Sequence, residues 1–450
     1  MQINVAGAGA GKTSKMADLL SRIDIPDGKV VFCIAFTNSS VENVEKKYLR
    51  KYGRIPDNIK ISTIHSFLYQ ELIHPYYYLL FGKHYQNLST IPLPSVPAFK
   101  NKKITELESQ DILHIERIPE RAKWVVYKKT NDTKTVCDNR AKMLSTFAQY
   151  CHSILIDEAQ DIGKDVKTVI DSLAEAGIEI VLYGDPKQDI RGGGHFQKLI
   201  DAESEPHYIR ECFRCPQIHL NISNTLADEK QRQFSSSENA AGKVSIVFES
   251  ETDVAAFIKD NDFGLQYISK KNERFETHSE KLDNRIDLLF YEVQRAIAKK
   301  WSTEKPELTI NRAAYYISER MLMDYDVSNN SAAEINKRIK SGWFDYPGNK
   351  EYAQMNAAFE KESTEANPVM LVSSIESIKG LESENCLFIL TTDLAPYLFL
   401  ENTDENRTKH LLYVALTRSL KDLTILVTKE VEKRYQKEYI INYLSEIMVS

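Results

Sequence analysis

A glycine- and alanine-rich loop near the N-terminus constrains the fold more than any other feature of this sequence. The run VAGAGAGKTSKM, residues 5–16, follows a short β-like segment and leads into SKMADLLSRI, whose apolar residues repeat at helical spacing. Small residues let backbone N–H groups approach a polyphosphate closely, and the N-terminus of the following helix adds its positive dipole end. The sequence therefore predicts a strand, a phosphate-binding loop and a helix.

Individual residues of this loop have separate expected roles. Lys12 is expected to reach the β- and γ-phosphates, and the Thr13 hydroxyl to ligate Mg²⁺. Ala6 stands at the first position of the usual G-x-x-x-x-G-K-[ST] pattern, a departure that costs little. The alternative is a flexible turn before an ordinary helix, which the lysine, the threonine and the flanking elements disfavour. The predicted nucleotide-binding residues of the loop are Ala6, Gly7, Ala8, Gly9, Ala10, Gly11, Lys12, Thr13 and Ser14.

Composition indicates a globular protein of two to four domains. The chain has 450 residues, of which 42% are hydrophobic and 27% charged. It shows no signal-like segment and no apolar run of membrane-spanning length, so we expect a cytoplasmic protein without a membrane partner. Because the net charge is −6, binding of nucleic acid requires a local basic surface.

The six cysteines lack the spacing of a disulfide framework, so we expect reduced thiols. Cys212 and Cys215 form a C-x-x-C pair. The sequence has no second pair at metal-like spacing, which disfavours a zinc site.

Two further apolar runs end in chemically active side chains. HSILIDEAQDI, residues 152–162, indicates a buried parallel strand, and such strands deliver side chains into a crevice at their carboxyl ends. Asp157 is expected to hold Mg²⁺ through water, and Glu158 to orient and deprotonate the attacking water. IEIVLYGDPKQDI, residues 178–190, repeats this design with Gln188 at the end of the strand.

The order of the motifs resembles that of a known family. AGAGAGKT, AFTN, TIHSF, LIDEAQD, YGDPKQ, ECFRCP, YISKKN, IESIKGLE and LLYVALTRS follow one another along most of the chain. This series is similar to that of the UvrD/Rep/PcrA-type superfamily 1 helicases. The resemblance implies an α/β fold of two RecA-like parallel-sheet P-loop NTPase domains, with ATP between them and single-stranded or partly duplex DNA crossing their top. It also implies ATP-driven movement along the strand from 3′ to 5′.

The resemblance assigns further residues to the ATP site. It implies that Gln188 senses the γ-phosphate, and that the second domain inserts Arg214 and Arg418 against the same phosphate. Hydrolysis would then depend on closure of the domains. Glu382, in KGLE, matches a ribose-contacting position. With ATP and Mg²⁺ as cofactors, the predicted catalytic residues are Lys12, Asp157, Glu158, Gln188, Arg214 and Arg418.

The adenine-reading glutamine motif of the family has no counterpart here. In the family it lies upstream of the phosphate loop, and only four residues precede Val5 in this sequence. Gln2 belongs to the same predicted strand as the loop and is too close to substitute for the motif. We therefore expect binding through the triphosphate and Mg²⁺, with weak selectivity for the base.

The matches on the DNA side are mixed. Phe36 matches a base-stacking position, although an aromatic residue at a strand end could equally belong to the core. Arg191 and Gly193 replace the Tyr and Trp of the family, and Glu376 replaces a DNA-contacting His. ATP hydrolysis is therefore predicted more firmly than processive unwinding. The residues expected to contact DNA are Phe36, Thr37, Asn38, Thr63, His65, Lys128 and Lys129.

The segments between the motifs predict accessory parts. A basic run at 121–143 interleaves lysines and arginines with Trp124 and Tyr127, as in a backbone-tracking surface with stacking rings, or equally in a solvated face. The expected division is 1–69 with 149–205 as the first RecA-like domain, 70–148 as an inserted accessory subdomain with helical and basic character, 206–272 with 366–450 as the second RecA-like domain, and 273–365 as a mostly helical segment with a reduced insertion.

Two other classes of function remain open at this stage. One is a nucleotide-gated regulatory ATPase that senses DNA or controls a nuclease without processive unwinding. Small UvrD-like proteins of this kind resemble the GajB-type subunit that accompanies an OLD/TOPRIM-type nuclease in Gabija anti-phage defence. The other is a non-motor ATPase such as a small kinase, which Arg418 and the KGLE motif disfavour.

Overall fold

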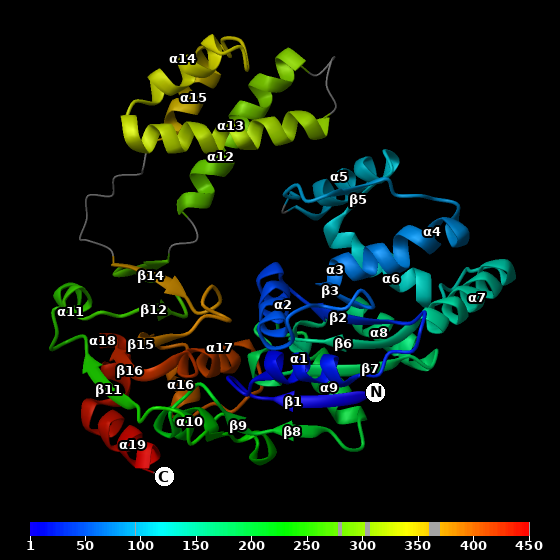
Figure 1. Ribbon diagram of the computed structural model, residues 1–450. Helices are drawn as coiled ribbons and strands as arrows, with labels where there is room; N and C mark the ends of the chain where they lie inside the picture. Colours follow the sequence, from blue (N-terminus) through cyan, green and yellow to red (C-terminus); the bar gives the residue numbers. More distant parts are fainter. Residues whose placement is uncertain (95, 278–280, 302–306, 360–369, 450) are drawn as a thin grey trace. The chain divides into compact units, whose positions relative to one another are not determined.

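The computed structural model of this chain describes residues 1–94, 96–277, 281–301, 307–359 and 370–449 (Figure 1). These residues form helices and two large sheets, each with six strands. The chain divides into two compact units. Unit 1 comprises Met1–Val254, Asp260–Leu265 and Lys379–Ser450, and unit 2 comprises Ala255–Lys259 and Gln266–Ile378.

The first sheet lies in unit 1 and has the strand order β3-β2-β6-β7-β1-β8, with parallel pairings throughout. Parallel neighbours need crossover connections, so helices must cover the faces of this sheet. Its strands are β1 (Gln2–Ala6), β2 (Val30–Ala35), β3 (Ile59–Thr63), β6 (Cys151–Ile156), β7 (Glu179–Gly184) and β8 (His207–Ile209).

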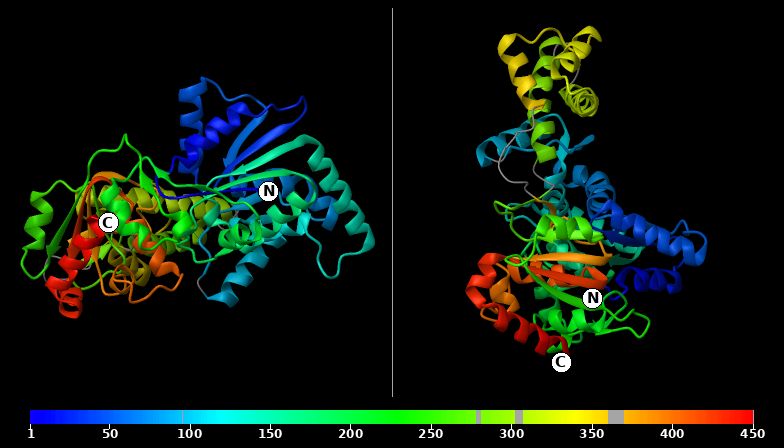
Figure 2. Two further views of the ribbon diagram at one scale, coloured as in Figure 1. Left: turned by 90° about the horizontal axis from the view of Figure 1, so that it is seen from below. Right: turned by 90° about the vertical axis from the view of Figure 1, so that its left-hand side faces the viewer.

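Alternate strand residues of the first sheet face two separate cores, as the period of two along a strand requires. On one face, Cys33 and Leu155 pack with Met16 of α1 (Lys12–Arg22) and Val44 of α2 (Asn38–Tyr52). Figure 2 draws these two helices in blue beside the strands. The other face packs against α3 (Ile64–Phe67), η1 (Leu68–Ile73), α6 (Ile118–Val126), α7 (Lys134–Tyr150), α8 (Lys164–Glu175) and α9 (His195–Ala202).

The insertion expected at 70–148, between the His65 and Asp157 motifs, is mainly helical. Its apolar residues, including Tyr77, Leu80 and Leu113, join the core that covers the second face of the first sheet. The insertion is therefore packed onto the domain that carries it. Besides α6 and α7 it contains α4 (His74–Phe81), α5 (Pro97–Ser109), η2 (Ile115–Arg117) and a parallel pair of short strands, β4 (Asn87–Ser89) and β5 (Ile112–His114).

The second sheet has the strand order β11-β16-β15-β12-β14-β13. Within unit 1, β16 pairs in parallel with β11 and β15, and within unit 2, β14 pairs in parallel with β12 and β13. The strands are β11 (Lys243–Phe248), β12 (Leu265–Ile268), β13 (Phe275–Thr277), β14 (Met370–Ser374), β15 (Ser383–Leu390) and β16 (Ser419–Val427).

The remaining helices differ between the two units. Those of unit 2 enclose their own apolar core, which includes Val293, Met321 and Phe359. They are α12 (Lys281–Trp301), α13 (Glu307–Ser328), α14 (Ser331–Lys340) and α15 (Asn349–Phe359). Unit 1 contains α10 (Gln217–Asn224), α16 (Ala395–Leu398), α17 (Arg407–Leu416), α18 (Lys429–Tyr435) and α19 (Lys437–Val449), and α11 (Val254–Asp260) spans a boundary between the units.

This arrangement confirms the predicted fold class. Within the described ranges, two six-stranded parallel sheets alternate with helices, one carrying a helical insertion and the other a further helical segment. The fold is that of two RecA-like domains. In the same ranges, no helix has the length and apolar character that crossing a membrane requires.

Candidate active site

The glycine-rich loop joins β1 to α1 at the carboxyl edge of the first sheet. Gly9 and Gly11 have φ angles of 66° and 72°, in the left-handed region that favours glycine. Lys12 is the first residue of α1, and its Nζ donates to the carbonyl oxygens of Ala6 and Gly7 at 3.4 Å. The lysine side chain is therefore folded over the loop that is expected to bind the nucleotide phosphates.

The two predicted metal ligands lie side by side. The Thr13 hydroxyl donates to Oδ2 of Asp157 at 3.0 Å, although the residues come from α1 and from the end of β6. Asp157 is 2% exposed, and its burial together with the charge of Glu158 raises its pKa to about 6. A hydroxyl next to a carboxylate is a hard oxygen donor set, which suits Mg²⁺. A divalent cation at these oxygens would favour the ionised carboxylate.

Glu158 is held in an unusual backbone conformation directly after Asp157. Its φ of 54° is left-handed, and Gln160 fixes its side chain by donating to Oε2 at 2.5 Å. Burial alone would raise the pKa of Glu158, but the charge of Lys12, the hydrogen bond from Gln160 and the charge of Lys379 together lower it. The carboxyl therefore stays ionised, which is the state that a general base needs.

Gln188 ends the short turn η4 (Pro186–Gln188), which follows β7, the strand between β6 and β1 in the sheet. Its Nε2 donates to Oδ2 of Asp185 at 2.9 Å, and Asp185 is completely buried. The other carboxylate oxygen of Asp185 pairs with Lys187 at 3.1 Å. The backbone N–H of Asp185 donates to Gln160 at 2.9 Å, so one amide side chain connects the Glu158 and Gln188 segments.

The turn at 212–215 packs directly against the phosphate loop. The Phe213 N–H donates to the Gly9 carbonyl at 2.8 Å, and a Cβ at Gly9 would lie 2.4 Å from Cβ of Arg214. Glycine at position 9 is therefore required by this contact as well as by its φ angle. Arg214 Nε donates to Oε2 of Glu382 at 2.7 Å, so two residues predicted from different motifs meet beside the loop.

The sequence reasoning missed Phe213. Its ring is 46% exposed, and Cδ2 lies 3.6 Å from the position of a Cβ at Gly11. An exposed aromatic ring beside the phosphate loop is placed to stack on a nucleobase. The signal was present in ECFRCP, where the aromatic residue directly precedes Arg214.

Gln233 and Tyr413 were also missed, and both bond to the loop. Gln233 Nε2 donates to the Ala8 carbonyl at 3.0 Å, while the Ala8 N–H donates to the Tyr413 hydroxyl at 3.2 Å. That hydroxyl in turn donates to Oε1 of Gln233 at 2.8 Å. The network links the loop to α17. Tyr413 belongs to the LLYVALTRS motif, whereas the polar segment around Gln233 gave no signal.

Arg418 has a structural role in this conformation. It is 1% exposed, and its guanidinium donates to the carbonyls of Val414 at 2.9 Å and Leu381 at 3.4 Å. It also donates to the Thr417 hydroxyl at 3.1 Å. Arg418 therefore joins the KGLE segment to the end of α17. The predicted contact with a γ-phosphate would require its guanidinium to exchange some of these acceptors.

Two residues predicted to contact DNA serve as helix caps. The Thr37 hydroxyl accepts from the Ser40 N–H at 3.1 Å, and the Thr63 hydroxyl accepts from the Ser66 N–H at 3.2 Å. These are N-cap bonds at the starts of α2 and α3, and they satisfy backbone donors that the helices leave unpaired. Both threonines lie at the carboxyl edge of the first sheet, the edge that carries the phosphate loop.

The other predicted DNA contacts at this edge differ in exposure. Phe36 is partly buried and packs against the core of the first sheet, while Asn38 and His65 are exposed. Partial desolvation and the charge of Arg191 lower the pKa of His65. The Arg191 side chain is 66% exposed and lies 4.0 Å from Asp161. A cation therefore stands near His65, on the loop where the helicase family has aromatic residues.

The basic segment forms the end of α6, a loop and the start of α7, and most of its cations contact other parts of the protein. Lys128 is exposed, as are Lys134 and Lys142. The available basic surface is therefore smaller than the sequence suggests. The internal contacts are ion pairs of Arg121 with Glu108, Lys123 with Asp165 and Arg140 with Asp132, and the placement of Lys129 over the rings of Phe81 and Trp124.

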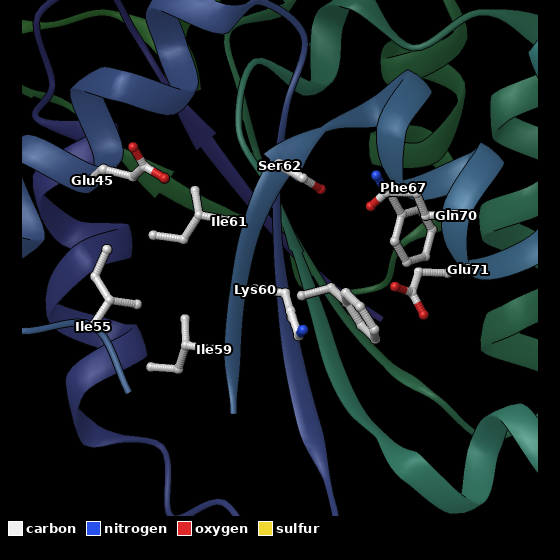
Figure 3. Close-up of a pocket in the computed structure, with 10 residues that line it drawn as sticks. Glu45, Ile55, Ile59, Lys60, Ile61, Ser62, Phe67, Gln70 and Glu71 are labelled. Carbon is white, nitrogen blue, oxygen red and sulfur yellow. The ribbon is translucent and has the colours of Figure 1, made fainter. Parts of the chain in front are cut away.

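A separate pocket of about 310 Å³ lies at the edge strand β3 (Figure 3). Ile59 and Ile61 face one side of the strand, while Lys60 and Ser62 face the other, beside Phe67. None of the residues predicted to bind nucleotide lines this pocket. It is therefore distinct from the nucleotide site.

The fold and the loop geometry define a P-loop nucleotide-binding protein. Residues 1–247 match the AAA domain family, and the chain belongs to this family. No curated protein matches the chain.

Solved structures with some likeness include viral helicases. The arterivirus nonstructural protein 10 helicase has 11% identity and a TM-score of 0.37, covering 94% of this chain and 59% of its own. The same helicase in a complex with DNA has 10% identity and a TM-score of 0.37, with coverages of 94% and 60%. The PRRSV helicase has 10% identity and a TM-score of 0.35, with coverages of 95% and 52%. The chain thus spans between half and two thirds of the length of these proteins.

Proposed function

We propose that this protein is a UvrD-like DNA translocase or helicase, in which single-stranded DNA stimulates ATP hydrolysis and hydrolysis drives movement from 3′ to 5′. The observation that carries the proposal is the meeting of four elements at one loop. Lys12 lies over the loop, the Thr13–Asp157 pair and Glu158 stand beside it, and the turn with Arg214 packs on Gly9. Phosphoryl transfer to water needs these four elements.

Each residue then has a defined task in hydrolysis. The backbone N–H groups of the loop and Lys12 would hold the phosphates, and Thr13 and Asp157 would hold a Mg²⁺ ion, which would supply positive charge to the phosphates. Glu158, kept ionised, accepts a proton from the attacking water. Gln188 is fixed by Asp185 at the neighbouring strand end. Arg214 supplies positive charge where the transition state develops negative charge.

The C-terminal part of unit 1 offers a route for coupling. Arg407 of α17 donates to the Ile190 carbonyl at 2.9 Å, and the His410 ring bonds the Asp189 carbonyl at 2.8 Å. Lys379 pairs with Asp161 of the LIDEAQD motif at 2.7 Å. The segments after both catalytic strands therefore contact Lys379 of the KGLE motif and the first turns of α17, the helix that continues into the LLYVALTRS motif. We propose that a change at the γ-phosphate reaches the DNA-facing loops through these contacts.

The test is an ATPase assay with and without single-stranded DNA. We expect stimulation that weakens with salt, because the slope of log affinity against log salt is about −0.7 per neutralised phosphate on single strands. Strand-displacement assays should show unwinding of short duplexes with a 3′ overhang and little with a 5′ overhang. Lys128→Glu with Lys134→Glu should reduce the stimulation and leave hydrolysis without DNA unchanged.

The matched control is Lys230→Glu with Lys433→Glu, which changes the charge equally at exposed positions of other elements. If both double variants lose stimulation by DNA, the loss is due to the change in net charge and not to the α6–α7 segment. An ATPase that ignores single-stranded DNA even at low salt would contradict the motor proposal.

One set of observations favours a second candidate, a nucleotide-gated regulatory ATPase. The Thr37 and Thr63 hydroxyls already cap helices, and several cations of the basic segment have internal partners. Weak binding of DNA is more consistent with an ATPase that regulates a partner protein than with a processive motor. A cytoplasmic role in anti-phage defence with an OLD/TOPRIM-type nuclease belongs to this candidate, and only the sequence resemblance supports it.

Phe213 gives a prediction about base selectivity. We expect Phe213→Ala to raise KM for ATP about tenfold, because stacking on an aromatic ring contributes roughly 1–3 kcal/mol per base. Stacking tolerates any base, so GTP and CTP should support hydrolysis within about tenfold of ATP, a gap of about 1.4 kcal/mol. Steady-state kinetics with the three nucleotides measure both effects. The exposed Phe234, replaced by Ala, is the control. Strict preference for ATP would show that another segment reads the base.

A further inference from the structure

A pair of cysteines lies in the turn that packs on the phosphate loop. Cys212 and Cys215 are fully buried, and the Cys215 N–H donates to Sγ of Cys212 at 3.3 Å. The Asn239 side chain donates to both of their carbonyl oxygens, at 2.7 and 3.2 Å. The two side chains pack in one buried cluster, and the Cys215 thiol is within hydrogen-bonding reach of the Cys212 sulfur.

The same turn carries residues of the proposed active site. Phe213 and Arg214 are the two residues between the cysteines. A Cβ placed at Gly9 would lie 3.0 Å from Sγ of Cys212 and 2.4 Å from Cβ of Arg214. The turn and the phosphate-binding loop are therefore closely packed. A change in the geometry of the turn must displace either the loop or Arg214.

The environment of Cys212 favours the thiolate form. The hydrogen bond from the Cys215 thiol lowers the pKa of Cys212 to about 6, against the opposing effect of burial and with help from the backbone N–H groups of Cys215 and Arg214 and from the charge of Arg214. The buried Cys33 and Cys151 behave in the opposite way, because desolvation raises the pKa of both thiols. A thiolate is the reactive form of cysteine towards oxidants and disulfides.

The C-x-x-C pair is suited to thiol chemistry. Among the residues that the structure describes, no group of three or more His, Cys, Asp or Glu side chains could hold a metal ion. Two neighbouring thiols, one of them nucleophilic, are the elements of a dithiol–disulfide couple.

We propose that Cys212 and Cys215 form a reversible disulfide that switches off nucleotide hydrolysis by displacing Arg214. Peroxide is the oxidant: the Cys212 thiolate attacks one oxygen of hydrogen peroxide, giving a sulfenic acid and, after protonation, water. The Cys215 thiol then attacks the sulfenic sulfur, forms the disulfide and releases a second water. The sum is two thiols and one peroxide converted to one disulfide and two waters. Reduction by an external dithiol reverses it.

The effect on activity follows from the packing of the turn. A disulfide places its sulfur atoms about 2.05 Å apart, so the turn between Cys212 and Cys215 must tighten. Phe213 is bonded to the Gly9 carbonyl and Arg214 to Glu382. Tightening strains these contacts and moves the guanidinium away from its place beside the phosphate-binding loop. This inference rests on the proposed ATPase function and adds its regulation.

The experiment uses the full chain with the exposed Cys137 replaced by Ser, which limits cross-links between molecules. The reduced protein is treated with a small excess of hydrogen peroxide, with and without an unhydrolysable ATP analogue and Mg²⁺. Peptide mass spectrometry maps disulfides, and ATPase rates are measured before oxidation, after it and after dithiothreitol. We expect a 212–215 disulfide, a loss of at least about tenfold in rate as expected for a displaced arginine, and recovery on reduction. Bound nucleotide should slow the oxidation.

Variants and outcomes separate this inference from the proposed function. Cys212→Ser and Cys215→Ser should each keep most of their own reduced rate after peroxide, and Cys386→Ser should remain sensitive. If these variants do not fold, the test is whether dithiothreitol restores the ATPase rate of the oxidised Cys137→Ser protein as the 212–215 disulfide is reduced. An active reduced protein that forms no 212–215 disulfide, or forms it without losing activity, overturns the inference. A reduced protein with no ATPase activity in any condition contradicts the proposed function instead.

Discussion

Replacing Glu158 by Gln is expected to lower the rate of ATP hydrolysis by roughly 10³-fold, or about 4 kcal/mol, since a positioned general base contributes about 10²–10⁴-fold. The substitution keeps the size of the side chain and its place beside Gln160, but removes the ionised carboxylate that accepts the proton of water. Nucleotide should still bind and stay trapped. Single-turnover hydrolysis and binding of a fluorescent ATP analogue measure the two effects separately.

Lys12→Ala provides the contrast, because it should weaken nucleotide binding itself by removing the charge folded over the loop. The matched control for Glu158→Gln is Glu175→Gln, which removes a carboxylate charge at an exposed position in α8. A folded Glu158→Gln protein that hydrolyses ATP at the wild-type rate would remove Glu158 from the active site. Loss of activity in Glu175→Gln would point to a general effect of charge.

The sequence was sufficient for the parts of the site that depend on local order. Asp157 directly follows β6, and Gln188 follows β7 after one short turn; parallel strands bring such ends to one edge. The phosphate loop needed only its glycines, Lys12 and the helix that follows. The fold class was predicted from the same succession of strands and helices, with the second sheet inferred from the family resemblance.

Contacts distant in the sequence were beyond such reasoning. Gln233 bonds to Ala8, 225 positions away, and a polar side chain in a polar segment carries no mark of this partner. Thr37 and Thr63 occupy positions where a cap and a phosphate contact require the same hydroxyl. Arg140 looks like part of a basic surface in the sequence, but its side chain is 6% exposed and paired with Asp132. Only the folded chain separates these alternatives.

Arg214→Ala is expected to reduce kcat by about 10³-fold, the lower end of the effect of an arginine that stabilises the transferring phosphoryl group. Its Cβ lies against Gly9 and its guanidinium is held by Glu382 at 2.7 Å, so the side chain already lies beside the phosphate-binding loop. Binding of ADP should change little, because the arginine acts on charge that develops at the γ-phosphate. Arg214→Lys should not restore the rate, since an ammonium lacks the planar fork of a guanidinium.

Arg210→Ala, in the same segment, is the matched control. The exposed Arg210 side chain bonds the carbonyl of Arg232, so its replacement should leave kcat unchanged.

Glu382→Gln tests the positioning of the Arg214 side chain. Its carboxylate is 48% exposed, so the ion pair adds little to stability, but its loss frees Arg214 to take other orientations. We expect Glu382→Gln to lower kcat less than Arg214→Ala, and the double variant to resemble Arg214→Ala alone, because the glutamate acts through the arginine. Independent, additive losses would show that Glu382 contacts the nucleotide by itself, as the family resemblance implies. Full activity of Arg214→Ala would show that another residue supplies the positive charge at the γ-phosphate.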